Sequence, residues 1–115
     1  MILAVPVGPD DVVGHSFGKA TSVAVARVED GTIAGWEAFE VGWHVTHDSG
    51  THGSHHARIV RFLRDHGVDC VVARHVGPPM QRTLDSMGVR LVLGADGDAR
   101  AAVVAAAAGA VASGD

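Results

Sequence analysis

The stretch "HHARIVRFLRDHGVDCVVARHVGPPMQRTLDSMGVRLVLG" (residues 55–94) decides the fold, because its apolar residues change their spacing several times. Apolar residues first recur at helical spacing, and Gly67 then ends the predicted helix. The run "VDCVVA" (68–73) is apolar apart from Asp69, which is typical of a strand covered on both faces. "GPPM" begins a second helix with prolines in its first turn, and "VRLVL" (89–93) follows as another short strand. Two strands that each follow a helix predict parallel pairing through right-handed crossovers.

The residues before this stretch predict three further strands. "ILAVPV" (2–7) is a short apolar run, although its proline cannot donate a ladder hydrogen bond. "TSVAVARVE" (21–29) and "TIAGWEAFEV" (32–41) flank Asp30-Gly31, a strong signal for a tight hairpin. We therefore expect these three strands to form an antiparallel meander.

The whole chain of 115 residues is expected to be one α/β domain, residues 1–115, with a mixed five-stranded sheet. Strands 1–3 should be antiparallel and strands 4–5 parallel, with three helices flanking the sheet. The third helix is alanine-rich and follows "GADGD". We expect Val104, Ala107 and Val111 to face inward there, so that small residues allow close packing on the sheet.

Composition excludes several classes of partner. The formal charge is −4, and Lys19 is the only lysine beside eight arginines, so there is no basic stripe for nucleic-acid phosphates. Cys70 is the only cysteine, which excludes an intramolecular disulfide. No apolar run reaches the roughly 20 residues that span a bilayer, and the first residues do not resemble a signal peptide. We expect a cytoplasmic protein that binds neither nucleic acid nor membrane.

The segment "GWHVTHDSGTHGSHH" (42–56) concentrates histidines in front of the first predicted helix. Neutral imidazole is a good ligand for transition metals, and several donors must converge for useful affinity. Gly53 and Ser54 argue against a helical His52, and Ser54 is the expected N-cap. A solvated loop is the competing interpretation. The candidate metal ligands in this segment are His44, His47, His52, His55 and His56.

Two further histidines are predicted at one end of the sheet. His75 follows the strand 68–73 just before a helix begins, a position where open α/β sheets collect ligands. His15 lies in the glycine-flanked loop "GHSFGKA" after the first strand. Because the first and fourth strands should be neighbours, we expect His15, His75 and one or more loop histidines to lie close together. The flanking glycines fit either a ligand approached closely by the loop or a tight turn with positive φ.

Three segments together give the chain a resemblance to a known family. They are "ILAVPVG", "GHSFGKATSVAVARVEDG" and the stretch quoted first. In this order and spacing they resemble the dinitrogenase iron–molybdenum cofactor biosynthesis family, and the resemblance covers nearly the whole chain. It implies a ribonuclease-H-like fold, and binding and delivery of iron–sulfur or iron–molybdenum cofactor precursors rather than turnover. It also implies a partner protein that assembles or receives the cofactor.

The chain departs in part from the motifs of the family that it resembles. Ser16 stands where the family often has histidine, Lys19 stands where it often has arginine, and the cysteine common in the family's loop is absent. A transition-metal ion is the alternative cargo, held by His15, His75 and the loop histidines. A monomer and a homodimer are both compatible with the sequence. The candidate cofactor-binding residues are His15, Ser16, Lys19, His75 and Gly77.

Catalytic functions fit the sequence less well than a non-catalytic carrier does. Metal-dependent phosphodiester hydrolysis needs converging carboxylates, and the first predicted strand contains no acid. A histidine-bound zinc could activate water, but the sequence shows no paired general base. A histidine-rich module that responds to pH or to a partner, without metal, is the main alternative.

Overall fold

A computed structural model describes the backbone of residues 1–46 and 52–113. The strands are β1 (Ile2–Val7), β2 (Ser22–Glu29), β3 (Thr32–Glu40), β4 (Cys70–Val72) and β5 (Arg90–Val92). The helices are α1 (Trp43–Thr46), α2 (His52–Asp65), α3 (Pro78–Ser86) and α4 (Ala99–Ser113), and a 3-10 turn spans Pro9–Asp11.

The five strands form one mixed sheet in the order β3-β2-β1-β4-β5. β1 pairs antiparallel with β2, and β2 pairs antiparallel with β3, as the meander prediction required. β4 pairs parallel with both β1 and β5. The predicted mixed α/β sheet and its strand directions are thus confirmed, whereas the ribonuclease-H-like assignment stays a prediction.

The prediction of three helices was wrong for the part of the chain that the structure describes, which contains four α-helices. The additional helix, α1, is a single turn directly after β3. Its Trp43 is only 3% exposed and contacts Phe17 and Phe62 edge-on, with ring centroids 5.3 and 5.5 Å apart. Tertiary packing of one aromatic side chain therefore holds a turn that is too short to form alone.

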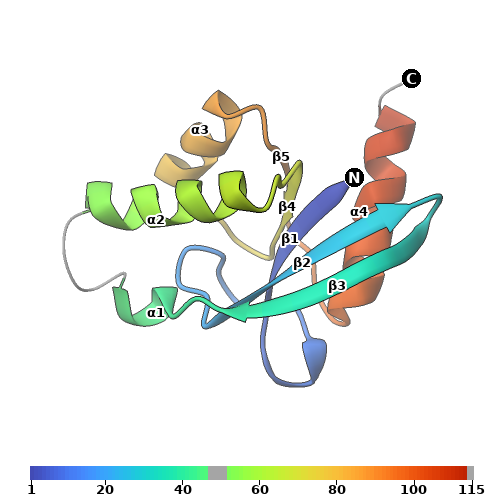
Figure 1. The fold of residues 1–115 in the computed structure, drawn as a ribbon, viewed down its shortest axis with the longest axis horizontal. Coiled ribbons are helices and arrows are strands. Elements are labelled where there is room, and N and C mark those ends of the chain that lie inside the picture. Colours follow the sequence, from blue (N-terminus) through green and yellow to red (C-terminus); the bar gives the residue numbers. More distant parts are fainter. Residues whose placement is uncertain (47–51, 114–115) are drawn as a thin grey trace.

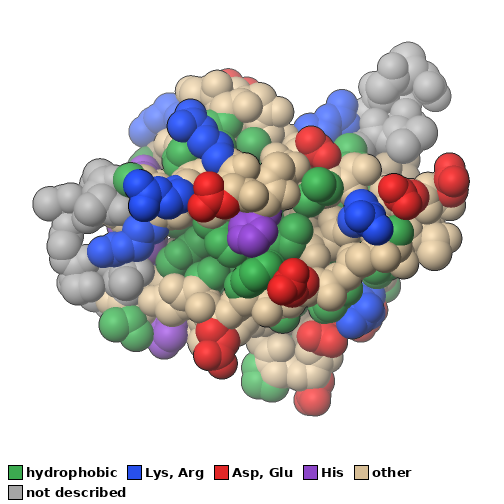
Figure 2. Space-filling model, viewed as in Figure 1, with side chains coloured by type: hydrophobic (Ala, Val, Ile, Leu, Met, Phe, Trp, Pro, Cys, Tyr) green, Lys and Arg blue, Asp and Glu red, His purple; other side chains and the backbone are tan. Residues whose placement is uncertain are grey.

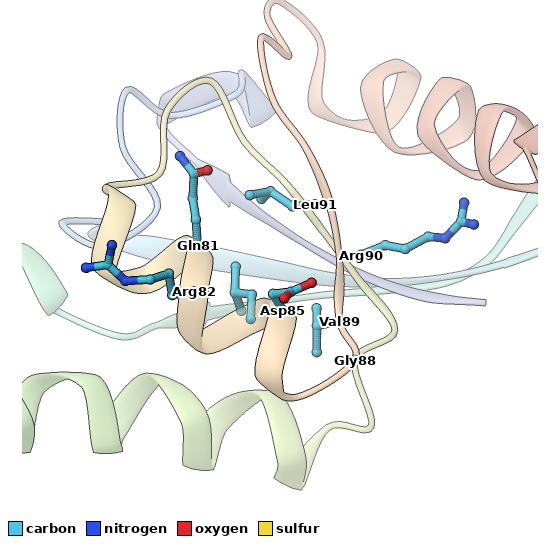
Figure 3. A pocket seen from close by; sticks show the side chains of 8 residues that line it. Gln81, Arg82, Asp85, Gly88, Val89, Arg90 and Leu91 are labelled. Atoms are coloured by element: carbon cyan, nitrogen blue, oxygen red, sulfur yellow. The ribbon is translucent and has the colours of Figure 1, made fainter.

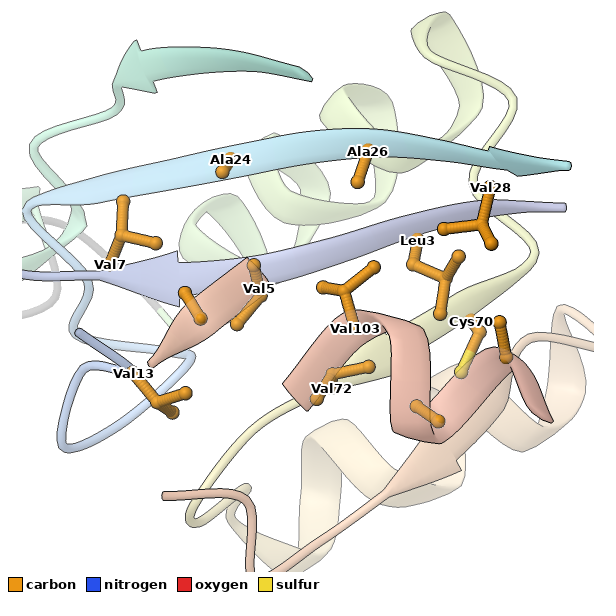
Figure 4. Close-up of a cluster of buried hydrophobic side chains, with 13 residues drawn as sticks. Leu3, Val5, Val7, Val13, Ala24, Ala26, Val28, Cys70, Val72 and Val103 are labelled. Carbon is orange, nitrogen blue, oxygen red and sulfur yellow. The ribbon is translucent and has the colours of Figure 1, made fainter. Parts of the chain in front are cut away.

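The sheet separates two hydrophobic cores. α1, α2 and α3 cover one face and α4 covers the other (Figure 1). On the α4 face, Leu3 and Val5 of β1 pack against Val103 of α4 (Figure 4). On the other face, Ile59 and Leu63 of α2 are fully buried in the second core. Side chains of successive strand residues point to opposite faces, so β1 contributes to both cores.

Pro6 lies in the central strand without breaking the ladder there. Its register partner on β2 is Val23, while pairing of β1 with β4 stops at Ala4. Beyond Ala4, β1 is bordered on that side by the loop that follows it. The amide of Gly14 in this loop donates to the Pro6 carbonyl oxygen at 2.7 Å. The missing N–H donor of Pro6 therefore costs no hydrogen bond to β4, and a proline is compatible with this position of the strand.

Two details of the helices differ from prediction. α2 begins at His52, so His52 is helical and Ser54 lies inside the helix rather than at its N-cap. In α4, Val103 is fully buried and Val104 only partly, so the inward face is shifted by one residue, while Ala107 is buried as expected. The side chain of Val111 lies outside the described residues.

Part of the sheet face beside α2 stays open. Figure 2 shows hydrophobic side chains exposed between α2 and β3 with one histidine among them. His66, just after α2, contacts the rings of Phe39 and Phe62, both at 4.5 Å between centroids. This histidine therefore has a packing role on the sheet. Among the described residues, no helix is both long and apolar enough to cross a membrane.

Candidate functional site

A cavity of about 340 Å³ lies beside the loops that follow β1 and β4. These are neighbouring parallel strands, and the chain leaves them in opposite directions, towards β2 and towards β5. Open α/β sheets bind ligands at this kind of position. The lining residues come from the loop after β1, from α2, from the segment between β4 and α3, and from the start of α3: His15, Ser16, Gly18, Lys19, His55, His56, Ile59, His75, Gly77, Pro79 and Met80.

The first wall is the loop after β1, which is fixed by its glycine and its phenylalanine. Neither Gly14 nor Gly18 has a positive φ, so the tight-turn explanation for them was wrong. A Cβ on Gly14 would lie 3.4 Å from Pro6, which shows a close backbone approach instead. Phe17 is fully buried, and its amide donates to the His75 carbonyl oxygen at 3.2 Å. The loop is thereby joined to the segment after β4, and His15 and Lys19 are left exposed at the cavity.

The second wall is the first half of α2. His55 is 4% exposed, and its Nε2 lies 2.8 Å from the carbonyl oxygen of Gly18. A carbonyl only accepts hydrogen bonds, so Nε2 carries the hydrogen and donates it. His56 is half-buried, with its ring centroid 6.4 Å from that of His55. The two adjacent histidines therefore differ: one is fixed inside the protein, and the other can be reached from solvent.

The third wall is the segment between β4 and α3. His75 is exposed and lines the cavity, whereas Arg74 forms an exposed ion pair with Asp96 at 3.7 Å and does not. This agrees with the alternation expected at a strand end. Gly77 is the N-cap of α3 and lines the cavity, so the partially positive end of that helix lies beside it.

The floor of the cavity is apolar, which sequence reasoning missed. Ile59 and Met80 are fully or almost fully buried and also line the cavity. Both belong to the core formed by α2 and α3. Apolar residues at helical spacing indicate a buried face, and no signal in the sequence separates a core residue from one at the bottom of a cavity.

The lining has a basic character although the chain carries a net charge of −4. Its ionisable residues are Lys19 and four histidines, with no aspartate or glutamate among the lining residues. Together with the start of α3, this arrangement favours an anionic ligand over a cationic one. An apolar floor below it lowers the local dielectric constant and strengthens such interactions.

The structure places most of the predicted site residues around this cavity. His15, Ser16, Lys19, His75 and Gly77 all line it. Two loop histidines, His55 and His56, join them there. That these residues bind a cofactor or a metal stays a prediction.

One candidate ligand lies away from this group, and two others lie outside the described side chains. His44 is exposed on α1 and is not a lining residue. His47 lies outside the described residues, as does the side chain of His52. In the segments with described side chains, residues 1–45 and 55–109, no group of three histidine, cysteine, aspartate or glutamate side chains is arranged to hold a metal ion.

Two other hollows lie nearby. One of about 540 Å³ is open between α3 and β5, where Arg82, Asp85 and Arg90 line it without any histidine (Figure 3). Another, of about 770 Å³, lies beside Pro6–Pro9 and shares His15 and Lys19 with the histidine-lined cavity. The loop that carries these two residues therefore borders two hollows.

The fold and the cavity define a small α/β protein with a histidine-lined cavity beside the ends of two parallel strands. The chain belongs to the dinitrogenase iron–molybdenum cofactor family, which it matches over residues 1–109. No curated protein matches the chain significantly.

Solved structures share the fold. A NifB-like protein of the DUF35 family from Thermotoga is 26% identical, with a TM-score of 0.68 over 94% of this chain and 88% of that one. The apo form of the orange protein from Desulfovibrio gigas is 24% identical, with a TM-score of 0.73 over 94% and 88% of the two chains. A dinitrogenase-like protein from Methanocaldococcus jannaschii is 14% identical, with a TM-score of 0.56 over 84% and 78%. The last two similarities concern the fold alone.

Proposed function

We propose that the protein binds and carries a metal–sulfur cofactor, an iron–sulfur cluster or an iron–molybdenum cofactor precursor, without catalysing a reaction on it. The single observation that carries this proposal is the histidine-lined cavity between the ends of β1 and β4, in a chain that belongs to a cofactor family. A cofactor-assembling or cofactor-receiving protein is the partner that such a carrier requires.

The residue types fit this cargo. Imidazole nitrogen is a ligand for iron, and Lys19 can balance negative charge on a sulfide-containing cluster. A volume of about 340 Å³ falls within the range of about 300–1,000 Å³ typical of small-molecule sites. Histidines spread over the walls suit a cargo with several metal atoms better than a single ion, whose donors must meet at one point.

Exposure suggests which histidines would hold the cargo. His15 and His75 are exposed at the cavity and lie on two different walls, and His56 is half-buried on the third. Ligation from several segments would place the cargo above the apolar floor, close to solvent. A position close to solvent suits a carrier, because the cargo must be transferred to another protein.

The proposal is tested by titrating the apo-protein without air, first with a preformed iron–sulfur cluster and then with zinc, nickel and copper ions. We expect cluster binding tighter than about 10 μM, which corresponds to roughly −7 kcal/mol. The double variant His15→Ala/His75→Ala should bind at least tenfold more weakly. His44→Ala is the matched control, because it removes an exposed histidine that does not line the cavity.

Each outcome of this titration is informative. No binding by the unaltered protein would refute the carrier and favour the interaction module without metal. Equal weakening by His44→Ala would place the cargo elsewhere. Tight binding of one zinc ion without binding of the cluster would show that the cargo is a single metal ion rather than a metal–sulfur cofactor.

A further inference from the structure

His55 differs from every other histidine at the cavity. It is the one buried polar or charged residue in the part of the chain with described side chains. Its Nε2–H donates to the Gly18 carbonyl oxygen at 2.8 Å, across 37 positions of sequence, and its Nδ1 atom is buried. A histidine that coordinates a metal needs an accessible ring nitrogen with a free lone pair. Coordination through Nε2 would therefore require this hydrogen bond to break.

The bond joins two walls of the cavity. Gly18 lies in the loop that carries His15 and Lys19, and His55 precedes His56 on α2. On its other side, the same loop is joined to the segment after β4 through the Phe17 amide and the His75 carbonyl oxygen. The loop is thus hydrogen-bonded to α2 through Gly18 and to the segment after β4 through Phe17.

We propose that His55 is a positioning residue and not a ligand, and that its hydrogen bond to Gly18 sets the spacing between His56 on α2 and His15 on the loop. This inference rests on the proposed function, because the spacing matters for a cargo that touches both walls. A ligand that bridges two walls loses affinity when their separation varies, since binding must then select one separation out of several. A ligand that touches one wall loses little.

Two substitutions at one position test this role. His55→Gln keeps an N–H donor at nearly the distance of Nε2 from the backbone, whereas His55→Leu removes the donor and keeps an apolar side chain. His66→Leu is the control, because it is the same histidine-to-leucine substitution just beyond the end of α2. His66 does not line the cavity. The probe is an iron–sulfur cluster reconstituted without air from ferrous iron and sulfide. We expect His55→Gln and His66→Leu to bind within about threefold of the unaltered protein and His55→Leu at least tenfold more weakly.

A spectroscopic readout separates positioning from ligation. Pulsed electron paramagnetic resonance of the reduced cluster detects the nitrogen nuclei of histidine ligands. The nitrogen coupling should be the same in His55→Gln as in the unaltered protein. Loss of a coupling in His55→Gln, failure of His55→Gln to restore affinity, or full affinity in His55→Leu would each overturn the inference.

Amide hydrogen exchange of the apo-protein keeps this inference distinct from the proposed function. Phe17 and Ala20 have hydrogen-bonded amides in the loop, to His75 and to Phe17 respectively. Their exchange should be at least tenfold faster in His55→Leu and unchanged in His55→Gln. Unchanged exchange in His55→Leu overturns the positioning role even if the cluster binds. Absent cluster binding by the unaltered protein refutes the proposed function even if exchange behaves as expected.

Discussion

Cys70 lies in the middle of the molecule, in β4, where its side chain is fully buried. Burial raises the pKa of its thiol from 9.0 to about 11; Arg90 opposes this shift and Asp69 adds to it. The thiol therefore stays protonated at neutral pH and is a poor nucleophile and a poor metal ligand. Any metal bound by this chain would therefore depend on the histidines rather than on Cys70.

The thiol makes stability depend on pH in a definite direction. Because the folded-state pKa is raised, the folded protein holds a proton that the unfolded chain releases above pH 9. The stabilisation is therefore complete below pH 9 and is lost as the pH rises towards 11. We predict that the free energy of unfolding falls by up to about 3 kcal/mol more in the unaltered protein than in Cys70→Ala over this range. Urea unfolding under reducing conditions measures the difference, and parallel pH profiles would contradict it.

Single histidines were predictable only in part. His15 and His75 could be identified from the sequence as candidate site residues because each follows a strand. The two strands, β1 and β4, are neighbours in the sheet. The inward orientation of His55 could not, because its partner is a backbone carbonyl far away in sequence. No local pattern distinguishes His55 from His56, yet only His55 is buried.

At the scale of elements, the hairpin between β2 and β3 depends on two residues with positive φ. Asp30 has φ of 53° and Gly31 has φ of 76°. Glycine adopts this region without steric cost, whereas an alanine there costs about 1–2 kcal/mol. We predict that Gly31→Ala lowers the free energy of unfolding by about 1 kcal/mol or more, as measured by urea denaturation.

Gly35→Ala is the matched control for the hairpin. Gly35 lies in β3, the strand that follows the turn, and has no positive φ; a Cβ there would meet the Cβ of Arg27 at an ordinary 3.8 Å. We expect this substitution to change stability by less than about 0.5 kcal/mol. Equal losses from the two glycines would show that the turn conformation contributes nothing to stability.

Helices were predicted best where apolar residues recur clearly at helical spacing. The period of α2 and α3 and the glycines that end them could be identified directly from the sequence. The inward face of α4 was shifted by one residue, because alanines surround it and give little contrast between faces. α1 was missed because its single turn depends on the buried Trp43 rather than on any local preference. α2 begins at His52 although Gly53 and Ser54 locally disfavour a helix at that position.

At the scale of the whole molecule, the site follows from the strand order. β1 lies between β2 and β4, so the loop after β1 and the loop after β4 meet at the same end of the sheet. This meeting could be predicted from sequence once the parallel pairing was accepted. The cavity itself could not, because its apolar floor belongs to the core between α2, α3 and the sheet.

The most direct test of a histidine-lined carrier site is metal and sulfide analysis of the untagged protein purified from its native host without air. We predict stoichiometric iron and acid-labile sulfide in the unaltered protein and in His44→Ala. Both should be lost from His15→Ala/His75→Ala while its circular dichroism stays unchanged. Protein that contains neither metal nor sulfide, or a double variant that retains both in full, would contradict the account.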